Sequence, residues 1–246
     1  MSDTDTFSPV ATVRRLMRQA RTAALSTLLK RSGHPFGSLV TVACEADGTP
    51  IILLSGLAAH SRNLAEDPRA SLLFEDRILG DPQTGARATV IGRVERIADD
   101  GSARRRYLAR NPDAALYADF GDFAFHRLVI EDGHLVAGFG RAMRVKAEDI
   151  RLDLADRAEL VAAEADLTAR YNAEPGRIAA WAAALGADAG AWVVCGLDAE
   201  GLDLATTASE GRAFRRLTLQ ELATSPTSFE EALQTWEKNA GTQKIA

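Results

Sequence analysis

The fold is decided by residues 35–64, which read PFGSLVTVACEADGTPIILLSGLAAHSRNL. Val, Val and Cys recur at every second position of residues 40–44, and this period of two indicates a strand with one buried face. Asp47-Gly48 then supplies the residues that favour a tight turn, and residues 51–54 form an apolar return strand. The stretch therefore predicts an antiparallel hairpin.

Further signals for short elements follow this hairpin. A helix is predicted over residues 57–65 and a buried strand over residues 70–74. Residues 87–97 alternate over an unusually long run, with Gly92 placed where a bulge would bend a strand around a barrel corner. Residues 123–137 predict a second hairpin that turns at Asp132-Gly133. A small antiparallel barrel with peripheral helices fits this succession better than alternating strands and helices.

The N-terminal region predicts one long amphipathic helix. Ser8-Pro9 has the form of a helix start, and apolar residues recur at helical spacing from Val13 to Leu28. Arg14, Arg18 and Arg21 share one face, which we expect to be solvated.

The composition changes after about residue 148, where Ala-rich helical segments begin. Two helices are predicted over residues 155–170 and 177–185, then three short strands and a last helix that starts at Ser228. We therefore expect two domains, a barrel over residues 1–150 and a small α+β domain over residues 151–246.

Composition also bounds the function. The 246 residues carry a formal net charge of −5, which gives no general reason to bind nucleic acid. Cys44 and Cys195 are the two cysteines, and their surroundings show no metal-ligand spacing. No apolar run approaches the ~20 residues of a membrane span, and the first eight residues do not read as a signal peptide. We expect a cytoplasmic protein without a membrane or nucleic-acid partner.

Several separated motifs, in order, resemble the pyridoxamine 5′-phosphate oxidase-like split-barrel family, and more closely its HugZ-type haem-utilisation branch. The resemblance covers roughly residues 9–150. It rests on the stretch quoted above and on these further segments: Asp67–Leu73, Arg87–Gly92, Tyr107–Pro112 and Gly138–Ala142. It implies an α+β fold with an FMN-binding antiparallel split β-barrel that forms a homodimer. Residues 196–204 and 212–214 resemble the small domain often appended to this branch.

The resemblance implies an FMN-binding oxidoreductase that acts on an unidentified small molecule. Two alternatives stay open, a haem-binding or haem-degrading protein of the same fold and a non-catalytic ligand-binding module. No pairing of a nucleophile with a base and an orienting acid favours a hydrolase, and flavin chemistry does not need one.

The candidate cofactor-binding residues lie mostly in one segment. By resemblance, Ser61 and Arg62 correspond to residues that hold the FMN phosphate, with Ser55, His60 and Asn63 beside them; hydroxyls and a guanidinium suit such a dianion. Two further arginines, at the ends of barrel strands, are candidates to counter an anionic cofactor: Arg87 and Arg141. No catalytic residue is assigned.

Haem would need an axial donor, and His60 is the one histidine inside a family motif. No other metal site is predicted. Where the appended domain usually reads Asn-x-Asp-His, this chain has Asn172-Ala173-Glu174-Pro175, and no histidine follows His134. We therefore expect inefficient haem degradation even if haem binds.

Overall fold

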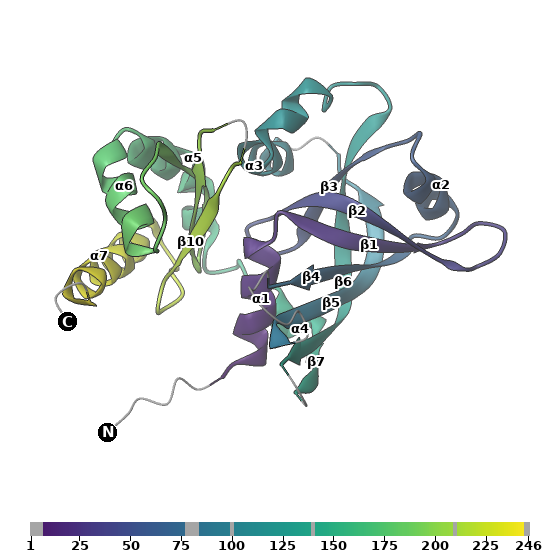
Figure 1. The fold of residues 1–246 in the computed structure, drawn as a ribbon, viewed down its shortest axis with the longest axis horizontal. Helices are drawn as coiled ribbons and strands as arrows, with labels where there is room; N and C mark the ends of the chain where they lie inside the picture. Colours follow the sequence, from purple (N-terminus) through teal and green to yellow (C-terminus); the bar gives the residue numbers. More distant parts are fainter. Residues whose placement is uncertain (1–6, 77–83, 99–100, 139–140, 209–210, 244–246) are drawn as a thin grey trace. The chain divides into compact units, whose positions relative to one another are not determined.

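The chain folds into two compact units, residues 1–152 and 153–246, in a computed structural model (Figure 1). The structure describes residues 7–76, 84–98, 101–138, 141–208 and 211–243. The Gly-Phe-Gly motif before Arg141 lies partly outside these ranges, at residues 139 and 140. Each unit is described by itself below.

The first unit is a closed antiparallel barrel. Its strands run in the order β3-β2-β1-β4-β5-β6, and pairing between β3 and β6 closes the ring, with β7 added beside β6. This confirms the predicted split-barrel class. The strands are β1 (Thr22–Leu28), β2 (Pro35–Cys44), β3 (Pro50–Ser55), β4 (Arg69–Glu75), β5 (Ala86–Arg96), β6 (Phe123–Ala137) and β7 (Ala142–Lys146).

Short helices surround the barrel. Val13, Leu16 and Met17 of the first helix are buried in the same core as inward-facing strand residues such as Val42 and Leu72. A second core lies outside β3, where Tyr107 packs edge-on against Phe125. The helices are α1 (Pro9–Gln19), α2 (Ala59–Glu66), α3 (Ser102–Arg110), the 3-10 turn η2 (Pro112–Leu116) and α4 (Ala147–Ile150).

The expected helix through Leu28 is wrong in its second half. The helix ends at Gln19, and Thr22–Leu28 form β1, which pairs along its whole length with β2. The buried residues at positions 23 and 25 are compatible with the alternation of a strand and also with one face of a helix. The spacing alone therefore does not distinguish the two structures. Pairing on both sides, with β2 and β4, decides for the strand.

The predicted turn at Asp132-Gly133 is also wrong, because β6 is one continuous strand of 15 residues. Gly133 pairs with Val90 on one side and with Val145 on the other, so neighbouring strands hold the backbone extended. A Cβ at Gly133 would lie 2.5 Å from Cδ1 of Ile150 and 3.2 Å from the carbonyl oxygen of Val145, so a side chain there would require Ile150 to move. The turn signal at Asp47-Gly48, in contrast, is confirmed by pairing of β2 with β3.

The bulge predicted at Gly92 is confirmed. The register of β5 against β6 shifts between Ile91 and Gly92. A Cβ on Gly92 would lie 1.9 Å from the carbonyl oxygen of Val129, so no side chain fits there.

The arginine stripe of α1 is not solvated as expected. Arg14 donates to the backbone carbonyls of Asp149 and Ile150. Arg18 is only 4% exposed, and its guanidinium donates to the carbonyls of Glu45 and Ala46. Two of the three side chains therefore hold α1 against α4 and against the turn between β2 and β3, a role that periodicity does not reveal.

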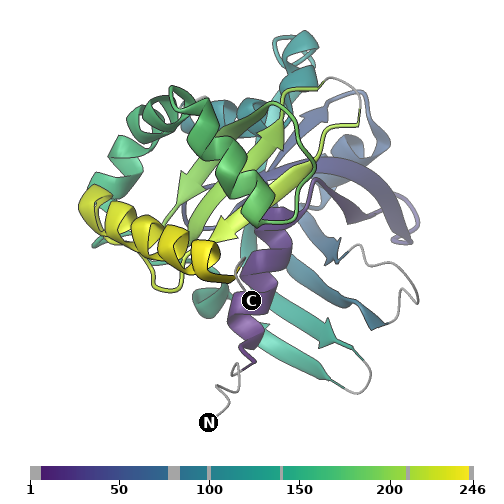
Figure 2. The ribbon, with the colours of Figure 1, turned by 60° about the vertical axis from the view of Figure 1, so that its left-hand side comes forward.

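The second unit has a three-stranded antiparallel sheet in the order β10-β9-β8, with two helices, α5 and α6, packed on β8 and a third, α7, packed on those helices (Figure 2). A buried ion pair of Arg216 with Asp198 joins β10 to the end of β8. The elements are α5 (Ala158–Asn172), α6 (Pro175–Ala184), β8 (Trp192–Asp198), β9 (Gly201–Thr206), β10 (Phe214–Thr218) and α7 (Pro226–Gln243). In the described parts of the chain, no helix combines the length and apolarity needed to cross a membrane.

Candidate functional site

The candidate site lies where β3 leads into α2. Ser55, the last residue of β3, donates its hydroxyl proton to a carboxylate oxygen of Asp122 at 2.5 Å and accepts from the backbone N–H of Leu57 at 3.1 Å. The Gly56 N–H also donates to the carbonyl of Asp122, at 2.6 Å. These bonds fix the connection against the segment that precedes β6.

His60 sits in the first turn of α2, half-buried. Its Nδ1 lies 3.1 Å from the hydroxyl of Ser38 on β2, while Nε2 has no hydrogen bond within the described residues. Burial lowers the pKa of His60, so the imidazole is neutral at pH 7. A neutral ring held at one nitrogen leaves the other nitrogen's lone pair available as a ligand.

The structure places the other three α2 candidates in different surroundings. Ser61 donates to the carbonyl of Ser55, and the exposed Arg62 donates to the carbonyl of Leu57. Asn63 is buried and donates to the hydroxyl of Thr27 on β1, so it anchors α2 to the barrel. The five candidates between Ser55 and Asn63 are thus brought together, in keeping with their closeness in sequence.

Arg87 and Arg141 lie apart from this group. Arg87 is near the start of β5, and the exposed Arg141 stands over the ring of Phe7 beyond the end of β6. β5 approaches α2 at its opposite end, at Arg96. Arg87 lies nine residues before Arg96, a distance of about 30 Å along a strand. Within one chain, the two arginines therefore do not join the α2 group.

His126 belongs to the same region and was not among the site residues predicted from the sequence. It lies on β6 directly opposite Ile52 of β3, a core residue, so it belongs to the inward-facing row of the barrel. Its Nδ1 bonds to the carbonyl of Ala124 at 2.9 Å, and burial is the main cause that lowers its pKa. The start of β6 pairs with the end of β3 that leads into α2, so His126 and His60 belong to the same end of the barrel. The alternation along β6, which places His126 on the same face as the apolar Leu128, could have indicated from the sequence that His126 faces inward.

Apolar surface adjoins this end. Leu57 is 75% exposed and Phe120 is 58% exposed, and they lie on the two segments that the Gly56–Asp122 bond joins. Exposed side chains of this size next to an available imidazole suit a flat apolar ligand. Among the described residues, no group of three or more histidine, cysteine and acidic side chains could hold a metal ion by itself.

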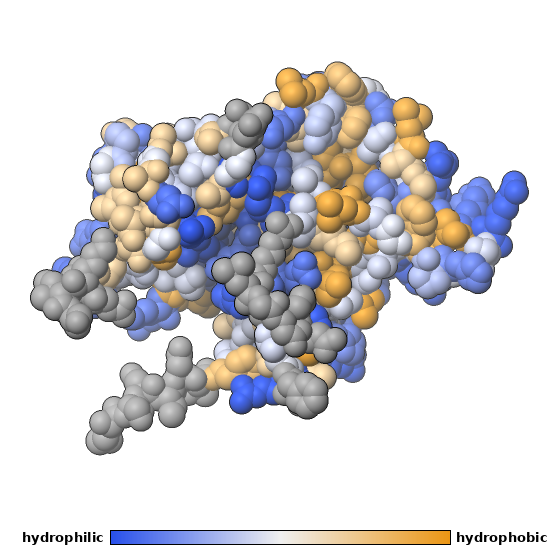
Figure 3. All heavy atoms as spheres, viewed as in Figure 1, coloured by the Kyte–Doolittle hydropathy of each residue, from blue (hydrophilic) through white to orange (hydrophobic). Residues whose placement is uncertain are grey.

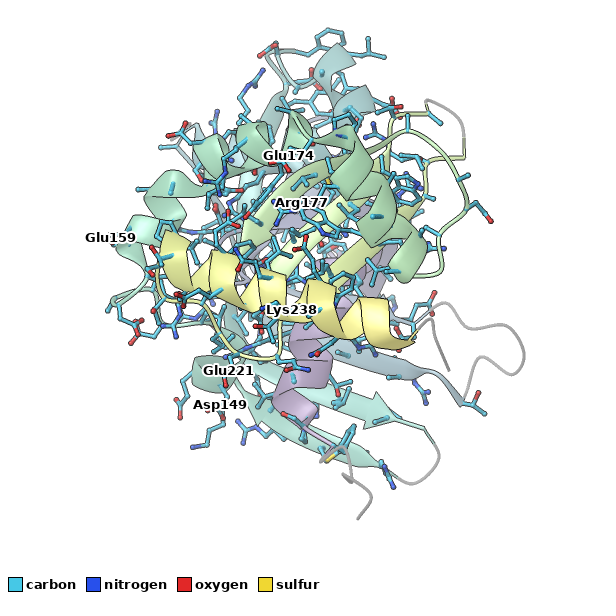
Figure 4. The ribbon with its side chains drawn as sticks, turned by 90° about the vertical axis from the view of Figure 1, so that its left-hand side faces the viewer. Asp149, Glu159, Glu174, Arg177, Glu221 and Lys238 are labelled. Atoms are coloured by element: carbon cyan, nitrogen blue, oxygen red, sulfur yellow. The ribbon has the colours of Figure 1, made fainter. Side chains whose placement is uncertain are left out.

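The unusual motif of the second unit has a structural role. Asn172 bonds to both the N–H and the carbonyl of Val194, and this docks α5 on the edge of β8. Glu174 pairs with Arg177 one turn into α6, which begins at Pro175 (Figure 4). The position of the missing histidine thus starts a helix.

A six-stranded closed antiparallel barrel with an added seventh strand and a capping α2 defines a split-barrel protein. Residues 6–150 match the family model described as "CREG, beta-barrel". The chain belongs to this family, and the predicted resemblance to split-barrel proteins with a haem-utilisation branch is confirmed.

Solved structures resemble the whole chain. The protein Atu2129 of unknown function from Agrobacterium tumefaciens str. C58 is 33% identical, with a TM-score of 0.81 over 96% of this chain and 97% of that one. A haem-binding protein from Mycobacterium smegmatis is 29% identical, with a TM-score of 0.56 over 96% of this chain and 98% of that one.

A curated relative is the non-canonical haem oxygenase HOZ, chloroplastic, of Arabidopsis thaliana. It is 35% identical over 188 residues, which are 69% of this chain and 55% of the relative. The chain therefore spans about half the length of that protein.

Proposed function

We propose that this protein binds haem at the α2 end of its barrel, with His60 as the axial ligand of the iron. The observation that carries the proposal is the neutral His60 imidazole, anchored at Nδ1 by Ser38 and open at Nε2. Similarity to proteins named for haem binding and haem oxygenation supports haem over the FMN expected from the sequence.

The residues around His60 suit this ligand. Leu57 and Phe120 offer exposed apolar surface to the porphyrin, and the guanidinium of Arg62 is exposed one turn away from the helix start. Bound haem would supply an iron centre, whose behaviour depends on the axial ligand and its support. The chain spans about half of the haem oxygenase it resembles, and haem binding is the property that the residues around His60 support.

The test is titration of the purified full chain with haemin, followed by its visible spectrum. We expect the titration to saturate and to give a Soret band at a wavelength typical of histidine-ligated haem. His60→Ala should lose this band. His134→Ala is the matched control, because His134 is exposed and faces Asp132 away from α2. A spectrum that is the same in both variants would contradict ligation by His60.

FMN remains the second candidate ligand, as part of the oxidoreductase expected from the sequence. The observation in its favour is that Ala58, the residue before α2, provides no side-chain cap, so first-turn N–H groups near Ser61 are available to a phosphate. Titration with FMN in parallel decides between the ligands. Saturable flavin binding by a sample that does not take up haemin would replace the haem proposal.

We also propose that the protein is a homodimer through an exposed apolar row on the barrel. Leu39, Ala24 and Leu73 lie side by side on β2, β1 and β4, and Ile91 of β5 is exposed close by. Figure 3 shows apolar side chains gathered over the barrel strands that face the viewer in Figure 1. An obligate interface there would bury about 2,000 Å² or more.

Light scattering is expected to give twice the 26.4 kDa chain mass for the wild type. Leu39→Glu should shift the mass to that of one chain, because it buries a charge in the interface. Leu222→Glu, a change at another exposed leucine, should leave the dimer intact. A wild-type mass of one chain at working concentration would refute the proposal.

A further inference from the structure

Two basic residues occupy inward-facing register positions at the open α2 end of the barrel, where Arg96 is exposed and His126 is half-buried. Arg96, the last residue of β5, lies directly opposite His126 of β6. The next inward pair along the same two strands is Val94 and Leu128, which belong to the barrel core. Because directly opposed residues share one face of a sheet, Arg96 and His126 continue the inward row at its open end.

The inward pair of Arg96 and His126 differs in its charges from the outer pair beside it. Arg96 makes no hydrogen bond or ion pair within the described part of the chain. The neighbouring pair on the outer face, Arg127 and Glu95, is matched in charge and joined at 3.3 Å. The same two strands thus place opposite charges together on the outside and two basic groups together on the inside.

The basic pair belongs to the end of the barrel that carries His60. Ser38, which holds Nδ1 of His60, lies two residues before the core residue Val40 and so on the inward face of β2. Burial lowers the pKa of His126, and the positive charge of Arg96 lowers it further. Strand register thus places Arg96 and His126 at the end of the barrel where Ser38 holds His60.

We propose that Arg96, with His126 beside it, is a carboxylate-binding subsite that takes an acid group of the ligand held by His60. The inference rests on the proposed function, in which that ligand is haem and its acid groups are the propionates. A guanidinium presents paired donors that match a carboxylate, and a site without a competing acid leaves those donors to the ligand. Arg96 is thus a residue that determines specificity for a porphyrin with free carboxylates.

The experiment compares haemin with haemin dimethyl ester, in which both carboxylates are esterified. Each is titrated into the wild type, Arg96→Leu and the matched control Arg127→Leu, and the affinity and Soret position are recorded. We expect the wild type and Arg127→Leu to prefer haemin. Arg96→Leu should lose about 10- to 100-fold in affinity for haemin and keep the affinity for the ester, because one charge-assisted contact is removed.

The Soret position should be the same in all three proteins, since His60 is unchanged. Ester binding by Arg96→Leu also shows that the variant is folded. Equal wild-type affinities for haemin and ester, with haem still bound through His60, would overturn the carboxylate subsite alone. Failure of the wild type to bind either compound would overturn the proposed function itself.

Discussion

Gly92→Ala is expected to destabilise the barrel by about 3 kcal/mol or more, or to prevent folding. The added methyl carbon would stand 1.9 Å from the carbonyl oxygen of Val129 and 3.2 Å from the Cα of Ile130. Both atoms belong to the backbone of β6, which cannot yield without breaking the ladder at the bulge. Chemical denaturation followed by circular dichroism measures the free energy of unfolding.

Gly37→Ala is the matched control for this substitution. Gly37 also lies in a barrel strand, and nothing stands within 4 Å of the position of its Cβ. Its free energy of unfolding should stay unchanged or rise by up to about 1 kcal/mol, because alanine restricts the unfolded chain. Similar losses in the two variants would show that glycine at position 92 is not needed for close packing of β5 on β6.

Arg18→Ala is expected to lower the free energy of unfolding by about 3 kcal/mol. The Arg18 guanidinium is buried and donates to the carbonyl of Ala46 at 3.0 Å and to that of Glu45 at 3.4 Å. Its removal leaves the carbonyls between β2 and β3 without these donors and opens a gap beside α1. Urea unfolding of the full chain gives the difference between variant and wild type.

Arg21→Ala serves as the comparison, because Arg21 belongs to the same predicted stripe but is exposed. An exposed charge contributes little, so we expect a change of a few tenths of a kcal/mol. Equal changes in the free energy of unfolding at positions 18 and 21 would show that Arg18 behaves as the solvated residue that periodicity predicts.

Several local features were predictable from the sequence because short-range physics produces them. The Asp47-Gly48 turn and the bulge at Gly92 depend on backbone conformations or clearances that glycine allows. The α2 candidates came together because the residues are neighbours in the chain and one turn of helix separates them at most. The family motifs indicated the fold class because they occur along the chain in the same order as the strands that contain them.

Other features depended on partners far away in the chain. β1 became a strand because β2 and β4 flank it, and Asp132-Gly133 stayed extended because β5 and β7 hold it. Arg18 became buried because α1 lies against the β2–β3 turn. In each case the local signal was compatible with two structures, and long-range pairing or packing selected one.

The antiparallel class, the hairpin at residues 40–54 and the α2 residues around His60 can be predicted from the amino-acid order, because these features depend on contacts within a few residues. The opposition of Arg96 and His126, 30 positions apart in the chain, cannot be predicted in this way and is seen in the folded barrel alone. The folded barrel also decided that Arg87 and Arg141 belong to its other end. Strand register sets such distances, and register depends on the closure of the whole sheet, to which every strand contributes.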